Sequence, residues 1–151
     1  MANKGKLLGV LVVAVAAGAY SLKLYSRASG NFNEMQMRAK RSEAAATTRA
    51  IRAAELAYYE AHGRYVQTGV PHPRPVIDLD GEQAPWTADN AGFVELGWEP
   101  EHPLRGAYWV TTTGGGFEVH GVIDCDGDGD PAHYVATDSI EVEYLAGPEV
   151  Y

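Results

Sequence analysis

The sequence predicts an α+β protein in which a long N-terminal helical spine, transmembrane in its first half, packs against a small antiparallel β-sheet. Three observations lead to this prediction: an apolar run near the N-terminus, a helix-forming stretch over 33–62, and alternating apolar and polar residues over 106–145. The helical stretch is rich in Ala, Arg and Glu, which lose little entropy in a helix. Its apolar stripe consists of Ile51, Ala54, Tyr58 and Ala61.

The apolar run over 7–20 follows two lysines and predicts a membrane anchor. Extended to Tyr25, it approaches the ~20 residues that span a bilayer. The anchor residues are Leu7, Leu8, Val10, Leu11, Val12, Val13 and Val15. The same features also fit a secretory signal peptide that is cleaved after Ala19. We expect retention, with an anchor and hinge over 1–30 and a head over 31–151.

The hinge is predicted at residues 28–31, where Ser and Gly interrupt the helical pattern. The second helix is expected to begin near Asn33 and to end at His62, because Gly63 is a typical helix stop. Residues 67–105 contain six prolines and predict a surface loop without regular structure.

The sheet is predicted over 106–145 as an antiparallel meander with one buried face. Its first two strands are expected at 106–113 and 117–123, separated by a run of three glycines. The third is expected at 133–137. The fourth alternates, with Ile140, Val142 and Tyr144 on one face.

The net charge of −8 is divided unevenly along the chain. Residues 1–52 carry nine Lys/Arg and two Asp/Glu, whereas residues 53–151 carry three and 18. An acidic head makes nucleic acid an unsuitable partner. The basic residues predict a surface for an acidic partner or anionic lipid, although a solvated helix face is the alternative. These predicted partner-binding residues are Arg38, Lys40, Arg41, Arg49 and Arg52.

The strongest chemical signal is an acidic segment over 124–130, DCDGDGD. Carboxylates at alternate positions suit Ca²⁺, and Gly129 stands where an EF-hand loop turns. Val135 stands where that loop needs a bidentate glutamate, so we predict a β-hairpin loop with Ca²⁺-like spacing. The alternative is a glycine-rich turn with solvated aspartates. The candidate Ca²⁺ ligands are Asp124, Asp126, Asp128 and Asp130.

Signals for other chemistry are weak. The sequence has no Gly-x-Ser-x-Gly elbow and no phosphate-binding Gly-Lys-Ser/Thr loop, so no catalytic residue and no small-molecule substrate is predicted. His120, Cys125 and His133 could meet across the hairpin as a zinc or copper site, but two strand histidines near a thiol are more often ordinary surface residues. We therefore expect a protein that is not an enzyme.

Three segments together resemble bacterial type IV pilin-like proteins, the pilin and pseudopilin superfamily. They are residues 54–66 (AELAYYEAHGRYV), residues 96–110 with LGWEP and RGAYWV, and the acidic turn at 124–129. The resemblance covers most of the chain from about Asn31 to Thr137. It implies an apolar N-terminal helix that packs with its copies in a filament core, and a head that in some members carries Ca²⁺.

The N-terminus departs from that family's pattern. Gly9 and Val13 stand where processed pilins have a phenylalanine and a glutamate, and Gly30 falls on their helix-interrupting proline. The usual prepilin processing motif is therefore missing, and no site is carried over for it.

The resemblance implies a non-enzymatic, membrane-anchored structural subunit that assembles into a filament or an envelope complex through its N-terminal helix. Its expected location is the bacterial cytoplasmic (inner) membrane, as a single-pass protein with a periplasmic head, or a surface filament. One alternative is an uncleaved pilin-like accessory subunit of another membrane complex. Another is an exported Ca²⁺-binding module cleaved after Ala19. Its own copies or other subunits are the expected partners.

Overall fold

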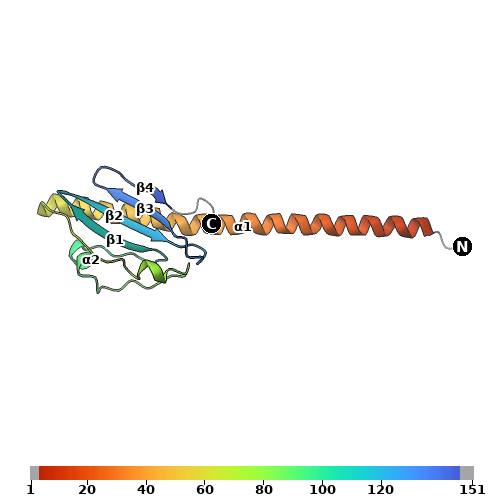
Figure 1. The fold of residues 1–151 in the computed structure, drawn as a ribbon, viewed down its shortest axis with the longest axis horizontal. Helices are drawn as coiled ribbons and strands as arrows, with labels where there is room; N and C mark the ends of the chain where they lie inside the picture. The colour runs from red at the N-terminus through yellow and green to blue at the C-terminus, as the bar shows by residue number, and fades with distance from the viewer. Residues whose placement is uncertain (1–3, 147–151) are drawn as a thin grey trace. The chain divides into compact units, whose positions relative to one another are not determined.

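The computed structural model describes the backbone of residues 4–146 and the side chains of residues 32–145. It divides into two compact units, Met1–Gln36 and Met37–Tyr151. Helix α1 (Lys4–His62) supplies the first unit and enters the second (Figure 1). Because α1 has no break, the predicted interruption at 28–31 is wrong. A single glycine such as Gly30 costs only about 1 kcal/mol inside a helix, too little to end one by itself.

The second unit contains a four-stranded antiparallel sheet in the order β1-β2-β3-β4 (Figure 1). This confirms the predicted α+β class and the meander. The strands are β1 (Ala107–Thr113), β2 (Gly116–Ile123), β3 (Ala132–Thr137) and β4 (Glu143–Ala146). The fourth strand begins later than predicted, because the N–H of Thr137 donates to the carbonyl of Ile140 at 2.8 Å and forms a turn there.

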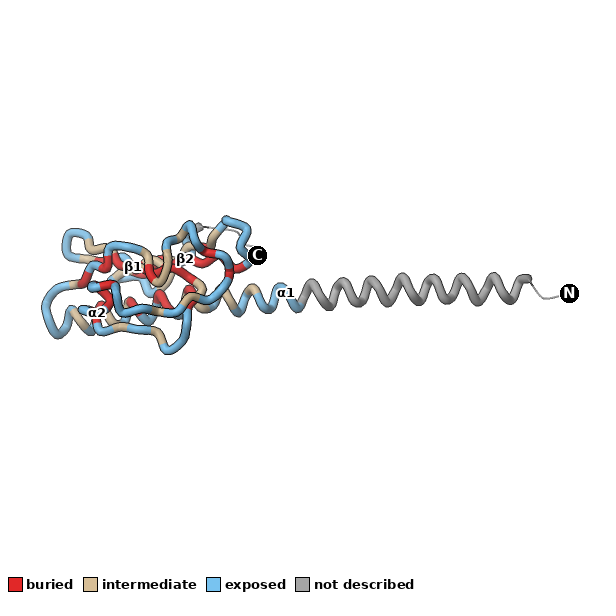
Figure 2. Tube along the Cα trace, turned by 90° about the horizontal axis from the view of Figure 1, so that it is seen from below, coloured by how far each residue is buried: buried red, intermediate tan, exposed pale blue. Residues whose placement is uncertain are grey.

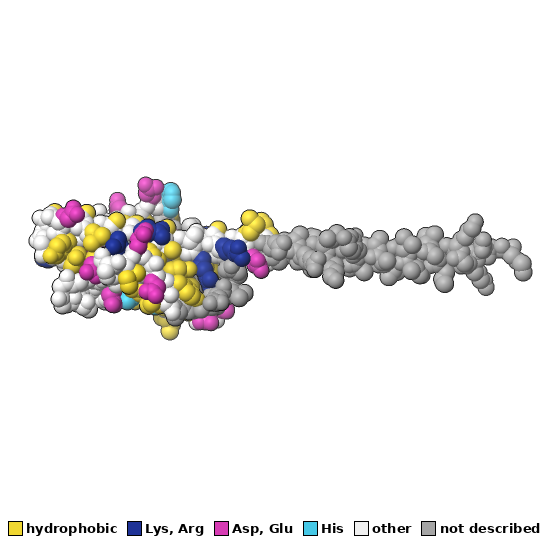
Figure 3. All heavy atoms as spheres, turned by 90° about the horizontal axis from the view of Figure 1, so that it is seen from above, with side chains coloured by type: hydrophobic (Ala, Val, Ile, Leu, Met, Phe, Trp, Pro, Cys, Tyr) yellow, Lys and Arg dark blue, Asp and Glu magenta, His cyan; other side chains and the backbone are white. Residues whose placement is uncertain are grey.

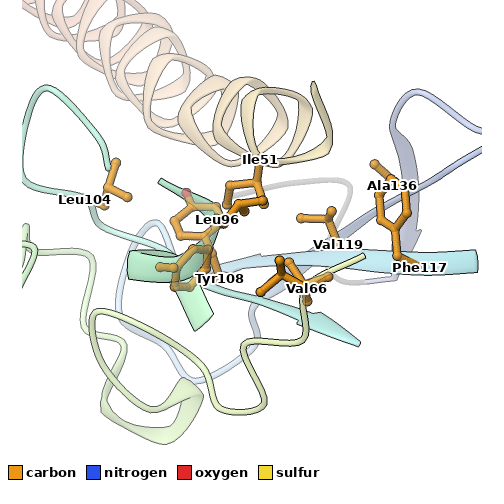
Figure 4. Close-up of a cluster of buried hydrophobic side chains, with 10 residues drawn as sticks. Ile51, Val66, Leu96, Leu104, Tyr108, Phe117, Val119 and Ala136 are labelled. Atoms are coloured by element: carbon orange, nitrogen blue, oxygen red, sulfur yellow. The ribbon is translucent and has the colours of Figure 1, made fainter. Parts of the chain in front are cut away.

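The core lies between α1 and the inner face of the sheet. Ile51 of α1 is fully buried, and Figure 4 shows it above the sheet beside Tyr108 and Leu96, with Val119 and Phe117 farther along. Figure 2 shows the buried positions gathered where α1 and the strands face each other. Among the α1 side chains that the structure describes, the buried ones are Ala44, Thr47, Thr48, Ile51 and Glu55. The predicted stripe therefore lies too far toward the C-terminus, since Ala61 is exposed.

The segment 67–105 is only partly the irregular loop that was predicted. It contains a 3-10 turn η1 (Val76–Asp78) and a short helix α2 (Ala91–Leu96). Asn90 caps α2 by accepting hydrogen bonds from the N–H groups of Gly92 and Phe93 at 3.0 and 3.3 Å. Gly97 ends it in the left-handed conformation, with φ of 68°. The sequence analysis did not predict this short capped helix, because the prolines at 71–85 favoured a loop for the whole segment.

Two carboxylates of α1 fasten the part of this helix that packs on the sheet to the rest of the second unit. Glu43 accepts hydrogen bonds from the N–H groups of Arg105 and Gly106 at 2.6 and 3.2 Å, just before β1. Glu55 accepts one from the N–H of Val66 at 3.0 Å, which holds the chain as it turns back from α1. Both acceptors satisfy backbone donors that would otherwise be buried without a partner.

Glu55 is the more unusual of the two because its carboxyl is fully buried. Its second oxygen, Oε1, has no hydrogen-bond partner among the residues that the structure describes. Burial raises the pKa of this carboxyl to about 7, although the Val66 N–H lowers it, and the charge of Glu95 adds to the rise. Burial of the Glu55 carboxyl, together with an oxygen that accepts no hydrogen bond, favours its protonated form.

We predict that stability falls as pH rises through the Glu55 titration. The folded-state pKa of about 7 lies above the ordinary value of 4.5, so between these values the folded protein holds a proton that the unfolded chain releases. The loss between pH 5 and pH 8 should be on the order of 2 kcal/mol, and Glu55→Gln should remove most of it. Urea unfolding at both pH values measures this. The difference between the two proteins isolates Glu55 from the histidines, and an unchanged slope in the variant would contradict the assignment.

Helix α1 approaches the sheet closely at Gly121 of β2. A Cβ placed on Gly121 would lie 2.1 Å from Oγ1 of Thr48 and 3.1 Å from the ring of Tyr108. The Thr48 hydroxyl is fully buried and, within the described part of the chain, has no hydrogen-bond partner. Glycine at this strand position is therefore required by the space between helix and sheet.

A double-mutant cycle tests this contact. Gly121→Ala should lower the free energy of unfolding by about 1–3 kcal/mol through overpacking, and adding Thr48→Ala should recover most of that loss. Thr48→Ala alone should change little, since it removes an unpaired hydroxyl. Gly116→Ala is the matched control, because its Cβ would meet no atom closer than 3.6 Å. Additive effects of the two substitutions would show that α1 and β2 do not meet there.

Candidate functional site

The acidic loop connects β2 and β3, as predicted from its spacing, and residues 124–131 form the hairpin connection. Asp124 is buried at its start and organises the turn. Its two carboxylate oxygens accept hydrogen bonds from the N–H groups of Gly127 and Gly129 at 2.7 and 2.9 Å. Both glycines have positive φ, 77° and 87°, which side-chain-bearing residues rarely adopt. The loop is therefore shaped by the chain itself.

Neighbouring segments hold this loop in place. Lys40 of α1 donates from Nζ to the carbonyl of Cys125 at 2.9 Å. A Cβ on Gly127 would lie 3.0 Å from the carbonyl of Asp80. The segment that contains Asp80 therefore packs directly against the acidic loop. Asp80 is itself paired with Arg74 at 2.7 Å. The acidic loop thus rests on a cation from α1 and on the segment after η1.

Three of the four predicted Ca²⁺ ligands come together. Asp124, Asp126 and Asp128 each offer one carboxylate oxygen, and these oxygens lie within 4.8 Å of one another. Ca²⁺ binds oxygens at about 2.3–2.6 Å, so ligands on opposite sides of one ion stand about 5 Å apart. The spacing therefore suits Ca²⁺. Asp130 does not join this group, and its N–H instead donates to the Asp128 carboxylate at 2.9 Å.

The predicted basic surface is largely engaged with the chain's own sheet. Arg49 pairs with Glu141 at 2.6 Å, and Arg52 donates to the carbonyls of Thr137 and Asp138 at 2.6 and 2.9 Å. Arg41 lies over the ring of Tyr144, 5.8 Å from its centre. On the face shown in Figure 3, basic and acidic side chains are interspersed. Together with Lys40, these cations fasten α1 to the sheet and to the turns that connect its strands, and their role toward a partner stays a prediction.

The predicted membrane location is corrected here. No helix in the described part of the chain has a segment long and apolar enough to cross a membrane. This contradicts a single-pass inner-membrane protein with a transmembrane first half of the spine. The predicted anchor side chains Leu7, Leu8, Val10, Leu11, Val12, Val13 and Val15 lie outside those that the structure describes.

The sequence analysis did not predict an aromatic pocket that lies beside α2. Trp86 meets Trp98 and Phe93 edge-on, with ring centres 5.2 and 4.9 Å apart. The cavity at these rings measures about 310 Å³, and Glu99 lies at its wall. Phe93 lies in α2 and Trp98 follows the Gly97 that ends this helix, whereas Trp86 comes from the loop before it, so nothing in the sequence spacing indicated that Trp86 would meet the other two.

Comparisons with known proteins add no support to the resemblance to type IV pilin-like proteins, which depends on the sequence motifs alone. No family model, no curated protein and no solved structure matches the chain.

Calcium should bind the acidic loop and raise the temperature of thermal unfolding, because a cation relieves repulsion among its carboxylates. Asp126→Asn and Asp128→Asn should abolish the shift. Asp130→Asn is the matched control and should retain it. Asp124 is unsuitable for substitution, since it also shapes the loop. Calorimetric titration of the full chain measures binding, and the absence of both heat and thermal shift at millimolar Ca²⁺ would leave a solvated glycine-rich turn.

Proposed function

We propose that this chain is a non-enzymatic structural subunit that works by assembly with copies of itself, through the N-terminal part of α1, in the manner of type IV pilin-like proteins. The observation that carries the proposal is the extent of α1. The helix runs to Lys4, and in the unit Met1–Gln36 it is the one described element. Nothing else in that unit, as described, is there to pack against it.

The apolar sequence at the N-terminal end of α1 needs a partner surface that shields it from water. Residues 7–20 carry no charged or strongly polar side chain, so every face of that stretch of helix is apolar. A helix that is apolar on all sides is buried against something, and a run of 10–14 apolar residues is typical of a helix buried in protein. Apolar helices of neighbouring subunits would provide that cover.

Two described side chains extend the apolar surface. Phe32 and Met35 are 60% and 70% exposed, although both are large and hydrophobic. They lie three residues apart on α1, which places them on the same side of the helix. Exposed apolar groups on one helix face are a feature of protein–protein contact surfaces.

Charge supports a second copy of this chain as the partner. Residues 1–52 have a formal charge of +7 and residues 53–151 have −15. Copies that place the basic part of one chain near the acidic part of the next would attract each other. An accessory role in a different complex would need a partner of complementary chemistry, and electron microscopy distinguishes a homopolymer from a hetero-complex.

A charge placed in the apolar stretch should disrupt assembly. Leu11→Asp should raise the concentration needed for assembly of the full chain by at least about tenfold, or 1.4 kcal/mol, because the carboxylate would be buried without a partner. Asn33→Asp adds the same charge at an exposed position of the same helix and should have little effect. Light scattering after size-exclusion chromatography measures both. A parent chain that stays monomeric at every concentration would refute the proposal.

A further inference from the structure

The outer face of the sheet, opposite α1, carries an aromatic and imidazole cluster. Trp109 of β1 stands directly across from His120 of β2, and their rings are stacked with centres 4.7 Å apart and planes 14° apart. His133 of β3 lies diagonally across from His120, since the direct partner of His120 is Val135. Both imidazoles are partly buried. Three adjacent strands therefore hold this cluster in a fixed arrangement.

The two imidazoles approach each other through specific nitrogens. Nδ1 of His120 lies 3.1 Å from Nε2 of His133. The other nitrogen of His120, Nε2, lies 3.6 Å from a carboxylate oxygen of Glu118 and 3.4 Å from the hydroxyl of Thr111. A proton on Nε2 is stabilised by that carboxylate, so Nδ1 presents its lone pair toward His133.

We propose that His120 Nδ1 and His133 Nε2 chelate a divalent transition-metal ion of the class that prefers imidazole, with Cu²⁺ bound most tightly. Two nitrogens bound to one ion at about 2.0–2.1 Å, with an angle between 90° and tetrahedral, stand about 2.9–3.4 Å apart. The 3.1 Å separation meets this requirement without movement of the strands. Solvent supplies the remaining ligands, which the partial exposure of the pair allows.

Glu118 acts as a positioning residue in this site. Metal-binding histidines usually donate their second ring N–H to a carboxylate, which fixes the tautomer and makes the free nitrogen a better ligand. Glu118 lies behind His120, 3.6 Å from Nε2, where its negative charge favours the tautomer that carries the proton on that nitrogen. Burial also lowers the pKa of both histidines, and the charge of His133 lowers that of His120 further. Both rings are therefore neutral at neutral pH, the form that binds metals.

Binding needs only one proton rearrangement. Without metal, the proton on His133 Nε2 is donated to His120 Nδ1 across the 3.1 Å contact. With metal, that proton moves to His133 Nδ1, and both facing nitrogens become ligands. No proton is released overall when both rings are neutral. Cys125, which the sequence grouped with these histidines, is buried among Ala44 and Ile123 toward α1 and does not belong to this site.

A Cu²⁺ titration of the full chain tests the site. Cu²⁺ quenches the fluorescence of a nearby indole, so the parent should lose the Trp109 signal with one-site binding. His120→Gln and His133→Gln should each weaken binding at least about tenfold, and Glu118→Gln should weaken it by about tenfold. His102→Gln, at an exposed loop position, is the matched control and should bind as the parent does. Trp109→Phe should remove the quenched signal while calorimetry still records binding.

Electron paramagnetic resonance of the parent with Cu²⁺ provides a test that needs no variant. Two coordinated imidazole nitrogens are expected in the spectrum. Asp126→Asn should leave Cu²⁺ affinity unchanged, which separates this site from the acidic loop. The proposal is overturned if the spectrum shows no nitrogen ligand, or if both histidine variants bind Cu²⁺ as tightly as the parent. The pair would then be an interstrand hydrogen bond alone.

Discussion

The packing of one face of α1 on the inner face of the sheet is the constraint on which the second unit depends. Ile51 is central to it, and Gly121 sets how closely helix and strand can approach. Carboxylates close the two ends of this contact: Glu43 holds the backbone that enters β1, and Glu55 holds the chain that leaves α1. A helix fixed by apolar burial along its middle and by backbone hydrogen bonds at both ends cannot shift its register without exposing donors.

The same contact brings basic residues of the N-terminal third of the chain next to the acidic remainder. Cations of α1 reach the turns of an otherwise acidic head, where Lys40 meets the acidic loop and Arg52 meets the turn after β3. Exposed ion pairs such as Arg49 with Glu141 contribute little stability individually, but hydrogen bonds to loop carbonyls set where these loops lie. The fold thus places Asp124, Asp126 and Asp128 together at one end of the hairpin.

The two faces of the sheet carry different side chains. Its inner face is apolar and buried against α1, whereas its outer face holds Trp109, His120 and His133 in a partly exposed cluster. Alternation along β2 produces this separation, since Phe117 and Val119 point inward while Glu118 and His120 point outward. Antiparallel pairing then brings a histidine from β3 alongside the one on β2.

The sequence by itself determined the long helix, the antiparallel meander and the hairpin position of the acidic loop, because periodicity and glycine-rich turns act over a few residues. It indicated a membrane span that the described helix does not support, and it placed the buried stripe too near Ala61. Only the tertiary structure decided that Glu55 and Thr48 are buried, that Lys40 and Arg52 serve the chain's own loops, and that His120 faces His133. These outcomes depend on the register between strands and on which helix face meets the sheet, and contacts between residues far apart in the chain leave no local pattern.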